Sequence, residues 1–178
     1  MYGPYPEQKR HSDTCSPGIN ATTMRPKRKE WTVFVPRPLE EVWDFFSRPE
    51  NLEKMTPEHV SFNIMSPIQG VEMYPGMVIQ YQISPLLGIP MNWITEITQI
   101  RDKTFFIDDQ RVGPYALWHH QHHFKAVEGG TEMTDILHYQ VPFGPIGSIA
   151  NWLFVERMVD QIFTFRETAI QKVFPANG

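Results

Sequence analysis

VERMVDQIFTFRETAIQKV, residues 155–173, has a hydrophobic period that differs from the rest of the chain, and this difference decides the fold. Its apolar residues recur at spacings of three and four and cover nearly half of a helical wheel, with polar residues on the opposite arc. The apolar set is Val155, Met158, Val159, Ile162, Phe163, Phe165, Ala169, Ile170 and Val173. We predict a long amphipathic helix over about residues 147–173, with an apolar face wide enough to pack against a curved sheet.

The chain before this helix predicts one strand, two short helices and six further strands. EWTVFVPRP, residues 30–38, alternates apolar and polar residues and ends in two prolines, which predicts a strand. Residues 39–57 have helical spacing that Pro49 divides into two short helices. The remaining strands are predicted at 59–65, 77–84, 90–100, 103–112, 117–127 and 131–141. Short connections favour an antiparallel meander, so we predict an α+β fold whose curved sheet of about seven strands wraps round the C-terminal helix.

Length and composition predict one domain in a chain of 178 residues. Residues 1–26 lack apolar periodicity and are predicted to be a disordered extension, which leaves 27–178 as the domain. No apolar run approaches the roughly 18 residues of a membrane span and no secretory signal is visible, so we expect a cytoplasmic protein. Residues 1–30 carry a charge of +3 and the remainder −7, and this acidic body argues against a nucleic-acid partner.

WHHQHHF, residues 118–124, places four histidines in one predicted strand. Alternation separates them, because neighbouring residues of a strand point to opposite faces. His119 and His123 share a wholly polar face, which we expect to meet water. His120 and His122 share a face with aromatic residues and are predicted to point into the interior.

The next strand supplies possible partners for the two inward histidines. A two-residue turn at Gly129–Gly130 would set His120 opposite Tyr139 and place Asp135 diagonal to His122. A buried aspartate needs a partner, which a histidine or a ligand hydroxyl would supply.

The preceding hairpin supplies a second candidate set. A tight turn at Arg101–Asp102 would pair Trp93 with Gln110 and Thr95 with Asp108. Both faces of this hairpin carry apolar residues, so periodicity alone does not choose the inward face.

The order of predicted elements resembles the helix-grip fold of the START-like, SRPBCC superfamily. The local sequence is most similar to the uncharacterised SRPBCC ligand-binding proteins often labelled cell-division-inhibitor-like, over about residues 30–174. The matching stretches are VWDFFSRPENLEKMTP (42–57), W-x-T-E-I (93–97), F-x-D-x-Q (106–110), GPYALWHHQHHF (113–124), TDILHYQVPFGPIG (134–147) and LFVERMVDQIFTFRE (153–167). The F-x-D-x-Q motif of this resemblance implies that Trp93, Asp108 and Gln110 face inward. The superfamily includes lipid carriers, hormone receptors, polyketide cyclases and oxygenase domains, so the fold does not choose among functions.

We therefore predict that a small, largely apolar molecule, hydrophobic or amphipathic, binds in the cavity between sheet and C-terminal helix, with no cofactor. A polar patch of His, Asp and Tyr side chains would orient it. The candidate ligand-binding residues are Trp93, Asp108, Gln110, Trp118, His120, His122, Asp135 and Tyr139.

Other functions stay open at this stage. A cofactor-free enzyme of the polyketide cyclase/dehydratase type would use His120, His122 and Asp135 as acid/base groups. The same residues could instead form a core network without ligand chemistry, and the division-inhibitor label suggests a regulatory or stress-related interaction domain. A zinc site would need Asp108 or Asp135 to converge on the two histidines; no cysteine cluster or HExxH helix supports it, and we predict no metal. No motif indicates the oligomeric state.

Overall fold

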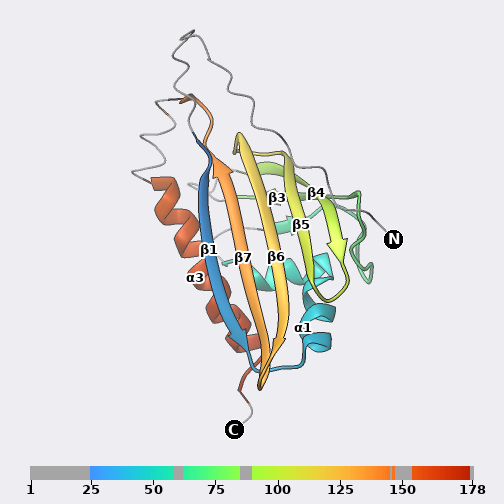
Figure 1. Ribbon diagram of the computed structural model, residues 1–178. Coiled ribbons are helices and arrows are strands. Elements are labelled where there is room, and N and C mark those ends of the chain that lie inside the picture. Colours follow the sequence, from blue (N-terminus) through green and yellow to red (C-terminus); the bar gives the residue numbers. More distant parts are fainter. Residues whose placement is uncertain (1–24, 58–61, 85–89, 145, 147–153, 177–178) are drawn as a thin grey trace, which may run out of the picture.

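The computed structural model describes residues 25–57, 62–84, 90–144, 146 and 154–176, and most of the expected extension at 1–26 lies outside them (Figure 1). The elements are β1 (Lys27–Val35), α1 (Leu39–Phe46), the 3₁₀ helix η1 (Pro49–Met55), β2 (Phe62–Ile64), β3 (Met77–Ile83), β4 (Met91–Arg101), β5 (Phe105–Val112), β6 (Leu117–Val127), β7 (Gly130–Gln140) and α3 (Glu156–Val173). This order confirms the predicted succession of one strand, two short helices, six strands and a C-terminal helix.

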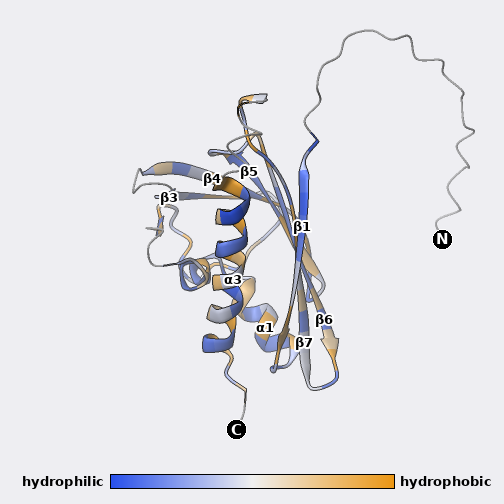
Figure 2. Ribbon diagram, turned by 90° about the vertical axis from the view of Figure 1, so that its left-hand side faces the viewer, coloured by the Kyte–Doolittle hydropathy of each residue, from blue (hydrophilic) through white to orange (hydrophobic). Residues whose placement is uncertain are grey.

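The described strands form one antiparallel sheet in the order β1-β7-β6-β5-β4-β3-β2. Each strand from β2 to β6 pairs with the next one in the chain, and β1 pairs with the other edge of β7. Figure 2 shows α3 on one side of the sheet, with β3 and β4 bent round towards it. The α+β helix-grip fold is therefore confirmed.

The predicted register of β4 and β5 is wrong. Arg101 pairs with Phe105 across a three-residue loop in which Lys103 adopts a φ of 51°. Two irregularities then shift the ladder, so that Thr95 lies opposite Gln110 and Ile97 lies opposite Asp108. Extra residues of this kind bend a strand and increase its twist, which suits the curvature of this sheet.

The predicted register of β6 and β7 is also wrong, by two residues. The turn consists of Glu128 and Gly129, not of the two glycines, and Gly129 takes the positive φ of 79°. Gly130 belongs to the strand, where it pairs with Val127, and the position requires glycine because a Cβ there would lie 2.3 Å from the carbonyl oxygen of Val35. A shift of two residues preserves the faces of both strands, so the inward set is unchanged.

α3 packs against the sheet through one face, as its sequence period predicts. Its buried residues are Val159, Phe163, Arg166, Ala169 and Ile170. The α-helix begins at Glu156, and residues 147–153 of the predicted span lie outside the described part of the chain. No helix among the described residues is long and apolar enough to cross a membrane.

β1 and α3 are held together by contacts along their shared edge. Trp31 of β1 stacks on Phe163 of α3, with ring centroids 3.8 Å apart and planes 1° from parallel. Lys29 of β1 forms ion pairs with Glu156 at 3.1 Å and with Asp160 at 2.7 Å, near the N-terminal end of the helix. These contacts fix α3 over the sheet and so define the space between them.

Candidate functional site

Three adjacent strands bring four polar side chains to the inner face of the sheet. β6 supplies His120 and His122 from its middle. Asp108 of β5 pairs with His120 on one side, and Asp135 of β7 pairs with His122 on the other. The strand order therefore places a carboxylate on each side of the two imidazoles.

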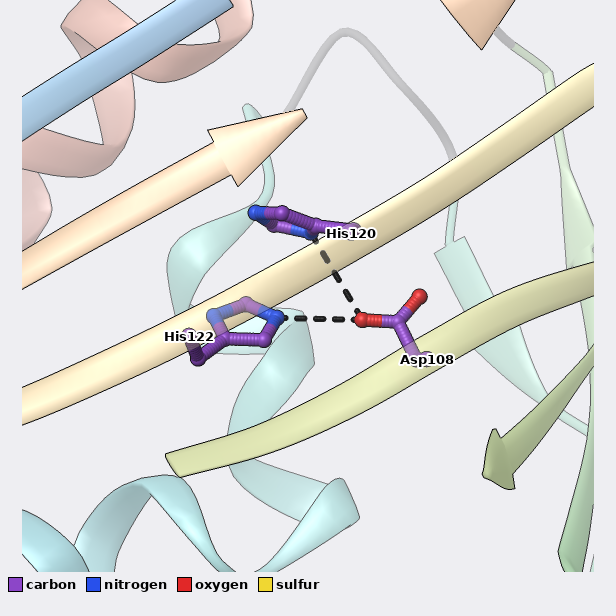
Figure 3. A group of neighbouring side chains, drawn as sticks. All are labelled: Asp108, His120 and His122. Carbon is purple, nitrogen blue, oxygen red and sulfur yellow. Dashed lines mark hydrogen bonds and ion pairs between the residues drawn. The ribbon is translucent and has the colours of Figure 1, made fainter. Parts of the chain in front are cut away.

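The two imidazoles lie between the two carboxylates. His122 Nε2 is 3.0 Å and His120 Nδ1 is 3.6 Å from the same oxygen, Oδ1 of Asp108 (Figure 3). The other nitrogens face Asp135 Oδ1, at 2.7 Å for His122 Nδ1 and 3.3 Å for His120 Nε2. Every ring nitrogen of the pair thus faces a carboxylate oxygen.

Arg166 of α3 completes this cluster from the helix side. Its Nε lies 3.3 Å from Asp135 Oδ2, and its Nη2 lies 3.2 Å from His122 Nδ1. Its guanidinium also stands 5.3 Å from the ring centroid of Phe46. Phe106 stacks on His122 with centroids 4.1 Å apart, which fixes the plane of that imidazole.

The cluster is buried, and burial controls its protonation. His120, His122 and Asp135 are each no more than 5% exposed. Burial would raise the pKa of Asp135, but Arg166 and the two histidines hold that pKa well below its ordinary value. Burial likewise opposes ionisation of Asp108, but the His122 hydrogen bond and the nearby positive groups lower the pKa of Asp108.

For His120, burial outweighs the nearby carboxylates. Burial and the neighbouring His122 lower the pKa of His120 below 6.5, against the pull of the two carboxylates. Its imidazole is therefore neutral at neutral pH, whereas both carboxylates are ionised. The two carboxylates and the guanidinium of Arg166 together carry a formal charge of −1.

A cavity of about 460 Å³ opens beside this cluster. Asp108, His120, His122 and Arg166 contribute to one part of its wall. The rest of the wall is mostly apolar and comes from η1, β3, β4 and α3, as shown by Leu52, Met55, Tyr81, Ile83, Ile97, Met158 and Ile162. The described residues thus form an apolar pocket with a local group of polar atoms.

Aromatic rings form the wall next to His120. Trp93 and Trp118 meet edge to face with centroids 5.2 Å apart, and Tyr115 lies 4.7 Å from Trp118. Trp93 donates its indole N–H to Thr95 Oγ1 at 3.0 Å. All four side chains line the cavity.

Three of the sequence-predicted residues lie behind the cavity wall. Gln110 donates to the backbone carbonyl of Tyr115 at 2.7 Å and accepts from the Tyr115 backbone N–H at 3.3 Å, so it braces that loop. Tyr139 is fully buried in a core cluster with Leu137. Asp135 touches the histidines from the side away from Asp108.

The outer face of β6 carries His119 and His123, as predicted. Both are half-buried and so only partly exposed to water. His119 Nδ1 lies 2.6 Å from Asp109, and Gln121 bridges His119 and His123 at 3.1 and 3.0 Å. These side chains form a polar row on the opposite side of the sheet from the cavity.

Arg166 is the functional candidate that sequence reasoning missed. Its position was visible in the helical period, since Val159, Phe163, Arg166 and Ile170 follow one another at spacings of three or four. A charged residue inside an apolar arc implies a buried partner, because an unpaired buried charge is costly. That partner is Asp135.

The comparisons with known proteins agree with this architecture. A family model described as "Polyketide cyclase / dehydrase and lipid transport" matches residues 35–165, most of the chain. The chain belongs to this family. The match contains Asp108, both inward histidines and Asp135, and it ends one residue before Arg166. The resemblance to the SRPBCC superfamily is thereby confirmed.

Solved structures show the same fold at low sequence identity. A protein from Arthrobacter aurescens is 15% identical with a TM-score of 0.63, over 84% of this chain and 88% of that one. TTHA0849 from Thermus thermophilus is 16% identical with a TM-score of 0.61, over 83% and 99% of the two chains. Ms6760 from Mycobacterium smegmatis is 15% identical with a TM-score of 0.58, over 82% and 92%. No curated protein matches the chain.

Proposed function

We propose that the protein binds a small, largely apolar molecule in the cavity between the sheet and α3. The observation that carries the proposal is the buried Asp108–His120–His122 group opening into an otherwise apolar space. Pockets of roughly 300–1,000 Å³ with a few convergent polar groups are typical small-molecule sites, and a volume of about 460 Å³ lies in that range. The lipid transport named in the family description is consistent with such a ligand.

The wall composition suggests how the molecule is oriented. Its apolar body would lie against Trp93, Trp118 and the apolar residues of α3. Its polar end would meet Asp108, His120 and His122, since these are polar groups at an otherwise apolar wall. Asp135, Gln110 and Tyr139 would support that wall from behind.

Filling the cavity tests this proposal. Ile162 of α3 lines the cavity, so Ile162→Trp places an indole in it, whereas Gln161→Trp places the same group on the exposed face of the helix. We expect the parent chain to bind the uncharged fluorescent probe N-phenylnaphthylamine, and Ile162→Trp to weaken binding at least about tenfold, about 1.4 kcal/mol. Fluorescence titration measures both affinities.

The matched variant makes the result specific to the cavity. Gln161→Trp should keep the parental affinity and a similar melting temperature. The proposal fails if the parent chain binds no apolar probe, or if Ile162→Trp binds as well as Gln161→Trp does. Native mass spectrometry of the purified chain adds a direct search for a retained apolar molecule.

A further inference from the structure

We propose that Asp108, His120 and His122 bind a divalent transition-metal ion of the zinc class at the polar wall of the cavity. One ligand atom of each residue lies within 4.8 Å of the other two. Figure 3 shows both imidazoles turning one nitrogen towards the same Asp108 oxygen. The third ligand that the histidine pair requires is therefore present on the neighbouring strand.

The spacing of the ligand atoms fits such an ion. Zinc bonds to nitrogen and oxygen of about 2.0–2.2 Å separate the ligands of a tetrahedral site by roughly 3.3–3.6 Å. Asp108 Oδ1 lies 3.0 Å from His122 Nε2 and 3.6 Å from His120 Nδ1. All three ligand atoms lie within 4.8 Å of one another, so side-chain adjustment would bring them to this spacing.

Asp135 occupies the place of an outer-sphere carboxylate. Histidines that bind metals almost always direct their other ring nitrogen at a carboxylate or carbonyl, which fixes the ring and its tautomer. Asp135 Oδ1 lies 2.7 Å from His122 Nδ1 and 3.3 Å from His120 Nε2. Arg166 in turn holds Asp135 from the helix side.

The formal charges around the histidines support the same assignment. All four imidazole nitrogens face carboxylate oxygens. The two carboxylates and the single guanidinium of Arg166 sum to a charge of −1, which a cation between Asp108 and the histidines would offset.

A second hydrogen-bond arrangement is available at His122. Arg166 Nη2 lies within hydrogen-bond distance of His122 Nδ1, and His122 Nε2 lies within the same range of Asp108. A proton on Nε2 satisfies both contacts, because Arg166 only donates, but it leaves the Nδ1 lone pair 2.7 Å from Asp135 Oδ1. Metal binding requires the other tautomer, in which Nε2 binds the ion and Nδ1–H faces Asp135.

The ligand set favours a transition metal over calcium or magnesium, which prefer oxygen-only coordination. Three protein ligands leave at least one coordination position open, as in catalytic zinc sites. Because all three residues line the cavity, that position faces it. Ion binding does not depend on the proposed function; only coordination of a bound ligand's oxygen atom would rest on it.

Metal titration of the purified chain, stripped with a chelator, tests the site. Calorimetry with zinc chloride should show one tight site that Asp108→Asn and His122→Gln each abolish. Asp109→Asn and His123→Gln, the same substitutions one residue along and on the outer face, should leave that site intact. Asp135→Asn should weaken zinc binding by about 10- to 100-fold, because outer-sphere partners of metal-binding histidines typically contribute that much.

Two further measurements keep the test decisive. Cobalt(II) chloride added to the unsubstituted chain should produce visible absorption and paramagnetically shifted signals from two imidazoles, which requires no variant to fold. The chelator-stripped parent chain should still bind N-phenylnaphthylamine, and Ile162→Trp should still bind zinc, so the two proposals fail separately. Absence of a tight zinc site, or its persistence in both inner variants, would overturn the metal assignment.

Discussion

The two faces of β6 carry the same residue types in different surroundings. His119 and Asp109 pair on the outer face at 2.6 Å, where the two side chains remain 31% and 23% exposed. His122 and Asp108 pair on the inner face at 3.0 Å, with side-chain exposures of 5% and 16%. The two faces of the same pair of strands therefore carry one His–Asp pair that is partly exposed to water and one that lines a cavity.

This difference shows that the surroundings, and not the residue types, give the inner group its chemical properties. Water screens the outer pair, so its members can exchange partners at little cost. The inner pair lies in a low-dielectric space, where each polar atom requires a fixed partner. Asp135 and Arg166 meet this requirement, and the outer pair has a neighbouring Gln121 in their place.

The largest expected effect is the difference between two separate variants, one that removes a buried carboxylate from the inner face and one that removes a carboxylate from the outer face. Asp135→Ala leaves Arg166 buried without its carboxylate partner, so we expect a loss of about 3–5 kcal/mol in the free energy of unfolding. Asp109→Ala should cost less than about 1 kcal/mol, because water can solvate the exposed groups that remain. Urea unfolding followed by circular dichroism measures both variants.

A double variant sharpens this prediction. Replacing both partners, as Asp135→Leu with Arg166→Met, should recover most of the stability lost in Asp135→Ala, because no unpaired charge remains buried. A similar loss of stability in Asp135→Ala and in the double variant would show that the cluster contributes through shape and not through charge. An equal loss in Asp135→Ala and Asp109→Ala would remove the distinction between the two faces.

A smaller difference is expected for apolar neighbours on β7. Leu137 points inward and is fully buried, whereas Ile136 points outward and is half-buried. Leu137→Ala should cost about 2–4 kcal/mol because it opens a hole in the core, and Ile136→Ala about 1 kcal/mol. Thermal and urea unfolding test the pair, and a reversed order would contradict the assignment of the faces.

Periodicity was sufficient for the fold and for the faces of its strands. The period of two assigned His120 and His122 to the interior, and the helical period identified α3, because both patterns record which side of an element meets the core. The register error between β6 and β7 had no effect on their inward set, since a shift of two residues preserves the faces.

The composition of the cluster depended on contacts that no local pattern records. The opposition of Asp108 and His120 comes from the β5–β6 register across residues 113–116, and the bulges of β4 changed the partner of Asp108. Arg166 meets Asp135 only because α3 packs across β7 at that height. Such distant pairings follow from tertiary packing and not from the spacing of residues in the sequence.

The ion pairs between β1 and α3 resemble the outer pair of β6, because their side chains are also partly exposed to water. Hydrogen bonds from Lys27 and Lys29 hold the pKa of Glu156 below its ordinary value. A lowered pKa in the folded state means that the pairing stabilises the protein above the unfolded pKa of about 4.3, and that the gain is lost as the pH falls further. Partial burial would lower the pKa of Lys29, but its hydrogen bonds to Asp160 and Glu156 raise it, so its contribution persists below about pH 10.4 and is lost above.

The smallest predicted effect follows from this window. Glu156→Gln should lower the free energy of unfolding at pH 7 by less than about 1 kcal/mol, because both partners are reached by water. The difference from the parent chain should shrink as the pH falls below about 4, where Glu156 of the parent also becomes neutral. Glu167→Gln, on the exposed face of the same helix, is the matched control and should show a smaller difference at pH 7. Urea unfolding at a series of pH values measures both, and a Glu156→Gln effect that stays constant down to pH 3 would show that Glu156 stabilises the edge by packing and not by charge.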